Sequence, residues 1–220
     1  MKITVLTCAP EMFESLMKDH VLDRAVSLGC LEIHIIDIRD YSGGCFRKVD
    51  DSPYGGGAGL ILRCQPVLDA LADAVKDAPG HAAVLVPGGR TFDQSVAEEY
   101  ASLDHLVLIC GHYEGMDERI LEEAGELLSV GDFILSGGEI AAMTVMDCVA
   151  RLLPGVLKNE SLKEESFSSG LLEYPQYTRP AEYKGKRVPE VLLSGNHEAV
   201  RRWREAAALE KTKKYRPDLL

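Results

Sequence analysis

The sequence lacks long apolar runs and has no C-x-x-C pair. Its apolar runs are only a few residues long, so none could cross a membrane as a helix. Six cysteines are scattered through 220 residues, which argues against a disulfide scaffold and against structural zinc. An acidic segment with helical spacing follows the first strand-like run too early for a secretory signal. We therefore expect reduced thiols in a cytoplasmic protein.

Two nucleotide-binding signatures are also missing. Gly55 and Gly57 are followed by Leu60 where the G-x-G-x-x-G fingerprint needs a third glycine. The single Gly-Lys dipeptide, Gly185-Lys186, lacks the rest of a Walker A loop. These absences argue against classical dinucleotide and P-loop chemistry.

Charge is divided unequally along the chain. Residues 176–220 hold 11 Lys and Arg against 6 Asp and Glu, a net charge of +5. Residues 1–175 hold the other 13 Lys and Arg and the other 29 Asp and Glu, a net charge of −16. The two parts sum to the net charge of −11 for the whole chain. An acidic body with a basic tail points to a polyanion partner. The plainer interpretation is a helical appendage whose charges simply face water.

Strand and helix patterns alternate over the first 153 residues. Apolar runs predict strands at 2–7, 31–38, 82–86 and 106–110, and helical spacing predicts helices at 11–28, 66–78, 93–103, 116–124 and 139–153. This order is typical of an α/β fold with a mainly parallel sheet, which binds ligands at the carboxyl ends of its strands.

Beyond residue 158 the pattern changes. Lys, Glu, Ser and Gly dominate to residue 174, and one clear helix follows from about 198 to 209, with Asn196 as its cap. We therefore predict an α/β domain at 1–158, a linker at 159–174 and a small, mostly helical basic domain at 175–220.

Glycine-rich segments interrupt the α/β pattern at Tyr54–Gly59, Pro87–Gly89, Gly111–Gly115 and Gly131–Gly138. Any one of them reads most simply as a tight turn. Glycine also allows close approach of the backbone to a ligand, and three of the segments follow strand-like runs. Together they favour a nucleotide-like ligand held by main-chain groups.

Several segments resemble one family closely: Val49–Gly59, Cys110–Arg119, Val130–Glu139, Leu192–His197, Pro10–Phe13 and Tyr177–Pro180. They are similar to the bacterial tRNA (guanine-N1-)-methyltransferases, the TrmD family of the SPOUT superfamily, in order through nearly the whole chain. The resemblance implies a trefoil knot at the C-terminal end of the parallel sheet domain and a homodimer that shares its active site between subunits. It also implies methylation of guanine 37, beside the anticodon of tRNA. Patterns alone would have indicated an open sheet, because true knots are nearly absent among folds.

By the same resemblance, the glycine-rich turns bind S-adenosyl-L-methionine, the methyl donor. The expected donor-binding residues are Val86, Pro87, Gly88, Gly111, Tyr113, Glu114, Val130, Gly131, Asp132, Phe133, Ile134, Leu135, Gly137 and Gly138. His112 stands where some relatives carry arginine and is expected near the donor or the RNA.

Guanine N1 carries a proton, so its methylation needs a base, and the charge that spreads to O6 needs a cation or donor. The resemblance assigns these catalytic roles to Glu165, where the family usually has aspartate, and to Arg151. The extra methylene matters, since a misplacement of about 1 Å can cost about 10²-fold in rate. Glu164 is the neighbouring alternative. The transfer needs no metal, and nothing in the sequence supports a role for Mg²⁺.

The expected tRNA contacts are the arginines of the basic tail, at Arg187, Arg201, Arg202 and Arg204. Contacts of this kind with phosphates provide affinity and salt dependence without sequence choice. Two other functions remain open: a nucleotide-binding enzyme of the open doubly wound type, and a non-catalytic RNA-binding module.

Overall fold

The computed structural model describes residues 1–220 with the exception of 19, 44, 159–161 and 163. The chain divides into two compact units, Met1–Leu157 and Lys158–Leu220. The segment predicted as a linker, 159–174, falls in the second unit, and its residues 159–161 and 163 lie outside the described residues. Among the helices of the described ranges, none has the length and apolar character to cross a bilayer.

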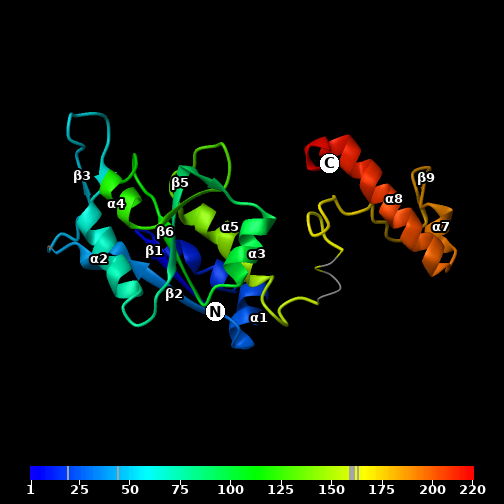
Figure 1. The fold of residues 1–220 in the computed structure, drawn as a ribbon, viewed down its shortest axis with the longest axis horizontal. Coiled ribbons are helices and arrows are strands. Elements are labelled where there is room, and N and C mark those ends of the chain that lie inside the picture. The colour runs from blue at the N-terminus through cyan, green and yellow to red at the C-terminus, as the bar shows by residue number, and fades with distance from the viewer. Residues whose placement is uncertain (19, 44, 159–161, 163) are drawn as a thin grey trace. The chain divides into compact units, whose positions relative to one another are not determined.

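A five-stranded sheet forms the centre of the first unit (Figure 1). Its order is β2 (Glu32–Asp37), β1 (Lys2–Thr7), β6 (His105–Cys110), β5 (His81–Thr91) and β7 (Glu126–Ser129). Every neighbouring pair is parallel. The central strand β6 is buried along its whole length, as a strand covered on both faces must be. The predicted α/β class with a mainly parallel sheet is confirmed.

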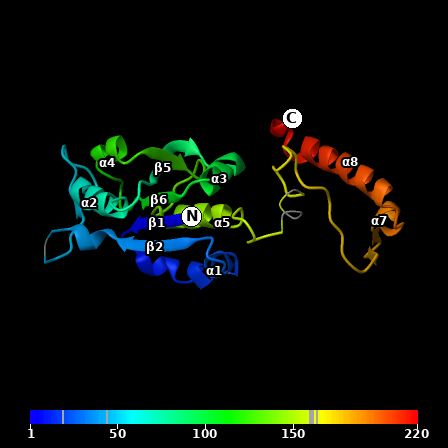
Figure 2. The same ribbon diagram turned by 60° about the horizontal axis from the view of Figure 1, so that its bottom comes forward.

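Helices cover both faces of this sheet (Figures 1 and 2). One buried cluster includes side chains of α1 (His20–Ser27), α3 (Gln94–Ala101) and α5 (Glu139–Ala150), and the other those of α2 (Cys64–Ala74) and α4 (Glu118–Glu123). Successive side chains of a strand point to opposite faces. Leu106 and Leu108 therefore join the first cluster, while Val107 and Ile109 join the second.

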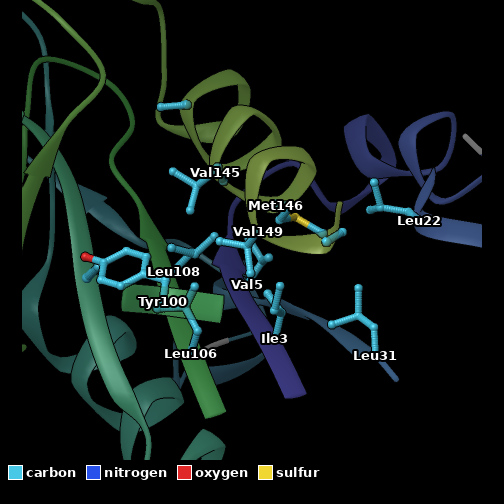
Figure 3. Close-up of a cluster of buried hydrophobic side chains, with 14 of the residues drawn as sticks. Ile3, Val5, Leu22, Leu31, Tyr100, Leu106, Leu108, Val145, Met146 and Val149 are labelled. Carbon is cyan, nitrogen blue, oxygen red and sulfur yellow. The ribbon is translucent and has the colours of Figure 1, made fainter. Parts of the chain in front are cut away.

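Helix α5 makes the central contact with the sheet (Figure 3). Its Val145, Met146 and Val149 lie over Ile3 and Val5 of β1, and all five side chains are fully buried. Burial of side chains of this size stabilises a fold by about 1.5–3 kcal/mol each. The packing holds the first residues of α5 beside the carboxyl end of β6, where the glycine-rich turns lie.

Strand β5 is longer than predicted. The pattern predicted an end at the Pro87–Gly89 turn, but the strand continues to Thr91 with a register shift between Leu85 and Arg90 against β7. A Cβ at Gly89 would lie 2.3 Å from the amide nitrogen of Leu128, so glycine here permits close strand contact and not a chain reversal. The four-residue strand β7 was not predicted, because a run this short carries no clear alternation.

The helix predicted at 11–28 is broken into three parts. Two 3₁₀ turns, η1 (Pro10–Phe13) and η2 (Leu16–Lys18), precede α1. Phe13 is the one fully buried residue of the two turns, so they lack the continuous apolar face that stabilises a longer helix. A two-residue antiparallel pair, β3 (Asp50–Asp51) with β4 (Ile61–Leu62), was also missed and flanks the Tyr54–Gly59 segment.

The second unit is built around α8 (His197–Tyr215), which extends six residues beyond the predicted end at Leu209. The side chain of Asn196 accepts a hydrogen bond from the amide of Ala199 at 3.1 Å, which confirms the predicted cap. The other elements given by its described residues are the pair β8 (Glu182–Tyr183) and β9 (Lys186–Arg187), the short helix α7 (Glu190–Leu193) and the turn η4 (Pro217–Leu219).

The close approach of β5 to β7 predicts opposite outcomes for two adjacent glycines. Gly89→Ala should lower the free energy of unfolding by about 1–3 kcal/mol, because the new methyl meets backbone atoms of Leu127 and Leu128 that cannot move aside. Gly88→Ala is the matched control: its Cβ meets nothing within 4 Å and should change stability by less than about 0.5 kcal/mol. Urea unfolding followed by circular dichroism measures both, and equal stability of the two variants would contradict this packing.

Candidate functional site

A cavity of about 530 Å³ lies at the carboxyl ends of β5, β6 and β7. This is the edge at which parallel α/β sheets bind their ligands, and the volume falls within the usual range of small-molecule sites, about 300–1,000 Å³. Its walls come from Leu85–Gly88 of β5, the loop after β6, and the end of β7 with the loop that leads to α5.

The cavity brings together all the predicted donor-binding residues except one. Val86, Pro87, Gly88, Gly111, Tyr113, Glu114, Val130, Gly131, Phe133, Ile134, Leu135, Gly137 and Gly138 line it. Asp132 is exposed and lies outside the lining. The cavity is also lined by Leu85, Leu127 and Leu128, which the sequence did not indicate: Leu85 belonged to a predicted strand, and no element was predicted at Leu127 and Leu128.

Two of the lining loops touch backbone to backbone. The amide of Gly138 donates a hydrogen bond to the carbonyl of Gly111 at 2.7 Å. A Cβ at Gly138 would lie 2.8 Å from the Cα of Cys110 and from the nitrogen of Gly111, so only glycine fits. The loop after β6 and the start of α5 are therefore held in contact through their main chains.

A buried carboxylate supports this contact. Glu139, the first residue of α5, is 1 % exposed, and its Oε1 accepts a hydrogen bond from Thr7 Oγ1 at 2.8 Å. A carboxylate is favoured at a helix N-terminus by the helix dipole. The same oxygen lies 3.6 Å from Nδ1 of His112, a lining residue, and this ring nitrogen is buried with no hydrogen-bond partner among the described residues. Sequence reasoning missed Glu139, although an acid directly after Gly137-Gly138 was an available signal.

The thiols near the cavity are not nucleophiles. Burial raises the pKa of the Cys8 thiol to about 11, and burial places the pKa of Cys110 well above its usual value. Both are therefore protonated at neutral pH, and a protonated thiol is a poor nucleophile. All six cysteines of the chain are free.

The glycine-rich segment Tyr54–Gly59 supports the cavity from outside its lining. A Cβ at Gly59 would lie 2.3 Å from Cγ of Glu114, and the φ of Gly59 is +78°, which favours glycine. The amide of Glu114 donates to the carbonyl of Leu60 at 3.0 Å. This segment therefore packs beneath Glu114, a lining residue, and is not itself a wall of the cavity.

The two predicted catalytic residues lie in different units. Arg151 follows the last residue of α5 and is partly buried. Glu165 lies in a turn of the second unit, is also partly buried, and its carbonyl accepts a hydrogen bond from Ser168 Oγ at 2.7 Å. The alternative, Glu164, has a carboxylate that accepts a hydrogen bond from the Tyr174 hydroxyl at 2.7 Å and lies 3.7 Å from the Arg204 guanidinium.

The predicted tRNA contacts differ in their surroundings. Arg201 and Arg202 are exposed on α8, where they pair with Glu205 and Glu198 one turn away. Arg187 is exposed and lies 3.2 Å from Glu182. Arg204 is less exposed, at 40% of its side chain, and its guanidinium lies 4.6 Å from the centre of the Tyr174 ring. The structure therefore separates three solvent-facing arginines from one that packs within its own unit.

A metal centre finds no support in the described part of the chain. Outside the residues excepted above, no three His, Cys, Asp or Glu side chains gather in a way that could hold a metal ion.

A family model and curated relatives of the same family both match the chain over its full length. A family model described as tRNA (Guanine-1)-methyltransferase TrmD matches residues 1–220. The chain is 50% identical over 220 residues to the tRNA (guanine-N(1)-)-methyltransferase of Clostridium beijerinckii, covering 100% of the chain and 92% of that protein. It is 50% identical to the protein of the same name from Geobacillus kaustophilus and 48% identical to that from Latilactobacillus sakei, each over 223 residues, covering 100% of the chain and 91% of each relative.

Proposed function

Because the chain belongs to the tRNA (guanine-1)-methyltransferase family, we propose that it transfers a methyl group from S-adenosyl-L-methionine to N1 of guanine 37, beside the anticodon of tRNA. The observation that carries this proposal is the cavity at the carboxyl ends of β5, β6 and β7, lined by the glycine turns that the family resemblance assigns to the donor.

The lining fits S-adenosylmethionine. An adenosine with an amino-acid arm needs apolar contact for the base and main-chain donors and acceptors for its polar edges. Leu127, Leu128 and Leu135 offer apolar contact for the base. The loops that meet at Gly111 and Gly138 offer main-chain donors and acceptors. When bound, the donor supplies a methyl group on a positively charged sulfur. Glu114, another lining residue, has an acidic side chain that would favour the positively charged sulfur in the cavity.

Proton removal from guanine N1 is assigned to Glu165. The family resemblance places the base at this position, with Glu164 as the neighbouring alternative. Glu164 already binds the Tyr174 hydroxyl and lies beside Arg204, which gives it a structural task. Arg151, at the end of α5, would stabilise the charge that develops on O6 when the N1 proton leaves. The target guanine would have to leave its stack to reach these groups.

The trefoil knot and the shared active site are part of the same proposal. A knotted turn requires chain segments to pass each other at backbone distance, and the contact of Gly138 with Gly111 is of this kind. Large side chains at the cavity rim remain exposed in the single chain, with Ile134 at 82% and Phe133 at 54%. Exposed apolar groups of this kind mark interaction sites. A homodimer whose second subunit covers them and contributes to the active site would account for them.

For tRNA binding we propose Arg187, Arg201 and Arg202, whose side chains face solvent on the basic second unit. Contacts with phosphates would orient the RNA, and the choice of nucleotide would be made at the cavity. The six free thiols, including the exposed Cys45, suit the reducing cytoplasm in which we place the reaction.

The direct test is transfer of a labelled methyl group from S-adenosylmethionine to unmodified tRNA transcripts. We expect 1-methylguanosine by mass spectrometry from a transcript with guanine at position 37 and none from the same transcript with adenine there. Tight tRNA binding without transfer would instead support a non-catalytic RNA-binding module. Protection against thermal unfolding by NAD, and not by S-adenosylmethionine, would support a dinucleotide enzyme.

Substitution of the two acids distinguishes the base. Glu165→Gln should lower kcat by about a hundredfold or more, because the amide cannot take the N1 proton. The affinity for S-adenosylmethionine, measured by calorimetry, should not change. Glu164→Gln is the matched control, since its amide oxygen still accepts a hydrogen bond from Tyr174 and its kcat should fall much less. The reverse order of the two effects would move the base to Glu164.

Charge reversal on α8 tests the RNA contacts. The double variant Arg201→Glu and Arg202→Glu should raise KM for tRNA, and the slope of log affinity against log salt should decrease by about 1 for each phosphate that is no longer bound. Lys76→Glu, one charge reversal of the same kind at an exposed position of the first unit, is the control. An unchanged salt slope in the double variant would remove these arginines from the interface.

A further inference from the structure

The segment that carries the two candidate acids is folded on itself. The amide of Phe167 donates to the carbonyl of Leu171 at 2.8 Å, and the amide of Glu173 donates to Ser166 Oγ at 3.0 Å. Ser168 Oγ donates a hydrogen bond to the carbonyl of Glu165 within the same turn. Residues 164–174, which we call the acid loop, therefore have internal hydrogen bonds that a free linker would not need.

The acid loop is also fastened to α8. The amide of Leu172 donates to Thr212 Oγ1 at 2.9 Å, and that hydroxyl in turn donates to the carbonyl of Ala208 at 2.8 Å. Thr212 is fully buried although it lies on a helix that is otherwise mostly exposed. Figure 1 shows the loop in yellow close to the red end of α8, and the hydrogen bond confirms that they touch.

A second group of contacts joins the two ends of the loop, Glu164 and Tyr174, to Arg204 in the middle of α8. Tyr174 donates its hydroxyl proton to Glu164, and the Arg204 guanidinium stacks on the Tyr174 ring and lies 3.7 Å from the same carboxylate. Burial and the neighbouring carboxylate raise the pKa of Tyr174 to about 12, so the hydroxyl remains a donor at neutral pH. The Nε of Arg204 is buried and has no hydrogen-bond partner among the described residues, so this part of the guanidinium is turned away from any phosphate in solution.

We propose that Glu164, Tyr174, Arg204 and Thr212 are positioning residues that fix the acid loop on α8, so that the base Glu165 and the basic helix move as one body. Arg204 is thereby assigned to the loop and not to RNA phosphates. The inference rests on the proposed function, in which Glu165 removes the N1 proton. Its consequence is that tRNA held by Arg201 and Arg202 and the base that acts on it share one rigid support.

Two substitutions remove the fastenings one at a time. Tyr174→Phe deletes the hydroxyl that binds Glu164, and Thr212→Val deletes the acceptor of the Leu172 amide while keeping the shape of the side chain. In each, hydrogen–deuterium exchange of the peptide that covers 164–174 should become about tenfold faster or more. With S-adenosylmethionine and tRNA saturating, kcat should fall by about tenfold or more, because a shift of about 1 Å in a catalytic group can cost about 10²-fold.

Binding constants separate positioning from general damage. KM for tRNA and the affinity for S-adenosylmethionine should stay within about twofold of the wild type, because neither ligand contacts these side chains in the proposal. Tyr215→Phe removes a hydroxyl from a half-exposed ring at the end of the same helix and should leave exchange and kcat unchanged. Glu164→Gln, which retains an acceptor for Tyr174, should keep exchange of the loop slow.

The outcomes are decisive in both directions. Unchanged exchange in both variants would overturn the fastening, and faster exchange with normal kcat would overturn its link to the base. A parallel rise in KM would return Arg204 and its neighbours to the RNA interface. If the wild type transfers no methyl group to tRNA, the proposed function fails, and the exchange data alone still decide whether the loop is fixed on α8.

Discussion

The first unit depends on one contact between main-chain segments. The amide of Gly138 reaches the carbonyl of Gly111 at 2.7 Å, and neither the helix that starts there nor the loop after β6 could approach so closely with a side chain at position 138. The packing of α5 on β1 sets the position of Gly138, and the buried Glu139 secures it through Thr7. The shape of the cavity therefore depends on the Gly138–Gly111 contact, on the packing of α5 against β1 and on the hydrogen bond between Thr7 and Glu139.

The sequence predicted the strands that are long and mostly apolar. The runs at 2–7 and 106–110 became β1 and β6, since burial on both faces requires continuous apolar side chains. It failed at β7, where four residues carry no period, and at Pro87–Gly89, where glycine serves contact between strands and not a turn. The pattern of neighbouring residues does not indicate which backbone, distant in sequence, a glycine will contact. At Gly89 that backbone is Leu127 and Leu128 of β7, and the contact allows the strand to continue.

The residues that line the cavity were predicted mainly from the family resemblance. The residues alone indicated only that three of the four glycine-rich segments follow strand-like runs in one sheet, and residues of three segments do line the cavity. The fourth, Tyr54–Gly59, supports Glu114 from beneath, a role that no spacing rule reveals. The lining by Leu85, Leu127 and Leu128 and the buried Glu139 also depend on tertiary packing. Similarly, the composition of 159–174, rich in Lys, Glu, Ser and Gly, predicted a linker; among its described residues, Leu172 binds Thr212 of α8 and Glu164 binds Tyr174.

The pairing of exposed charges on α8 has a consequence for how a polyanion would be bound. Arg201 and Arg202 already carry intramolecular counterions, because Glu205 and Glu198 lie one helical turn away. An incoming phosphate would have to displace a carboxylate from each guanidinium, and the released carboxylate would stay nearby and repel it. The acids of this helix, as much as its bases, would then set the affinity, and loose electrostatic capture of unrelated nucleic acids would be suppressed.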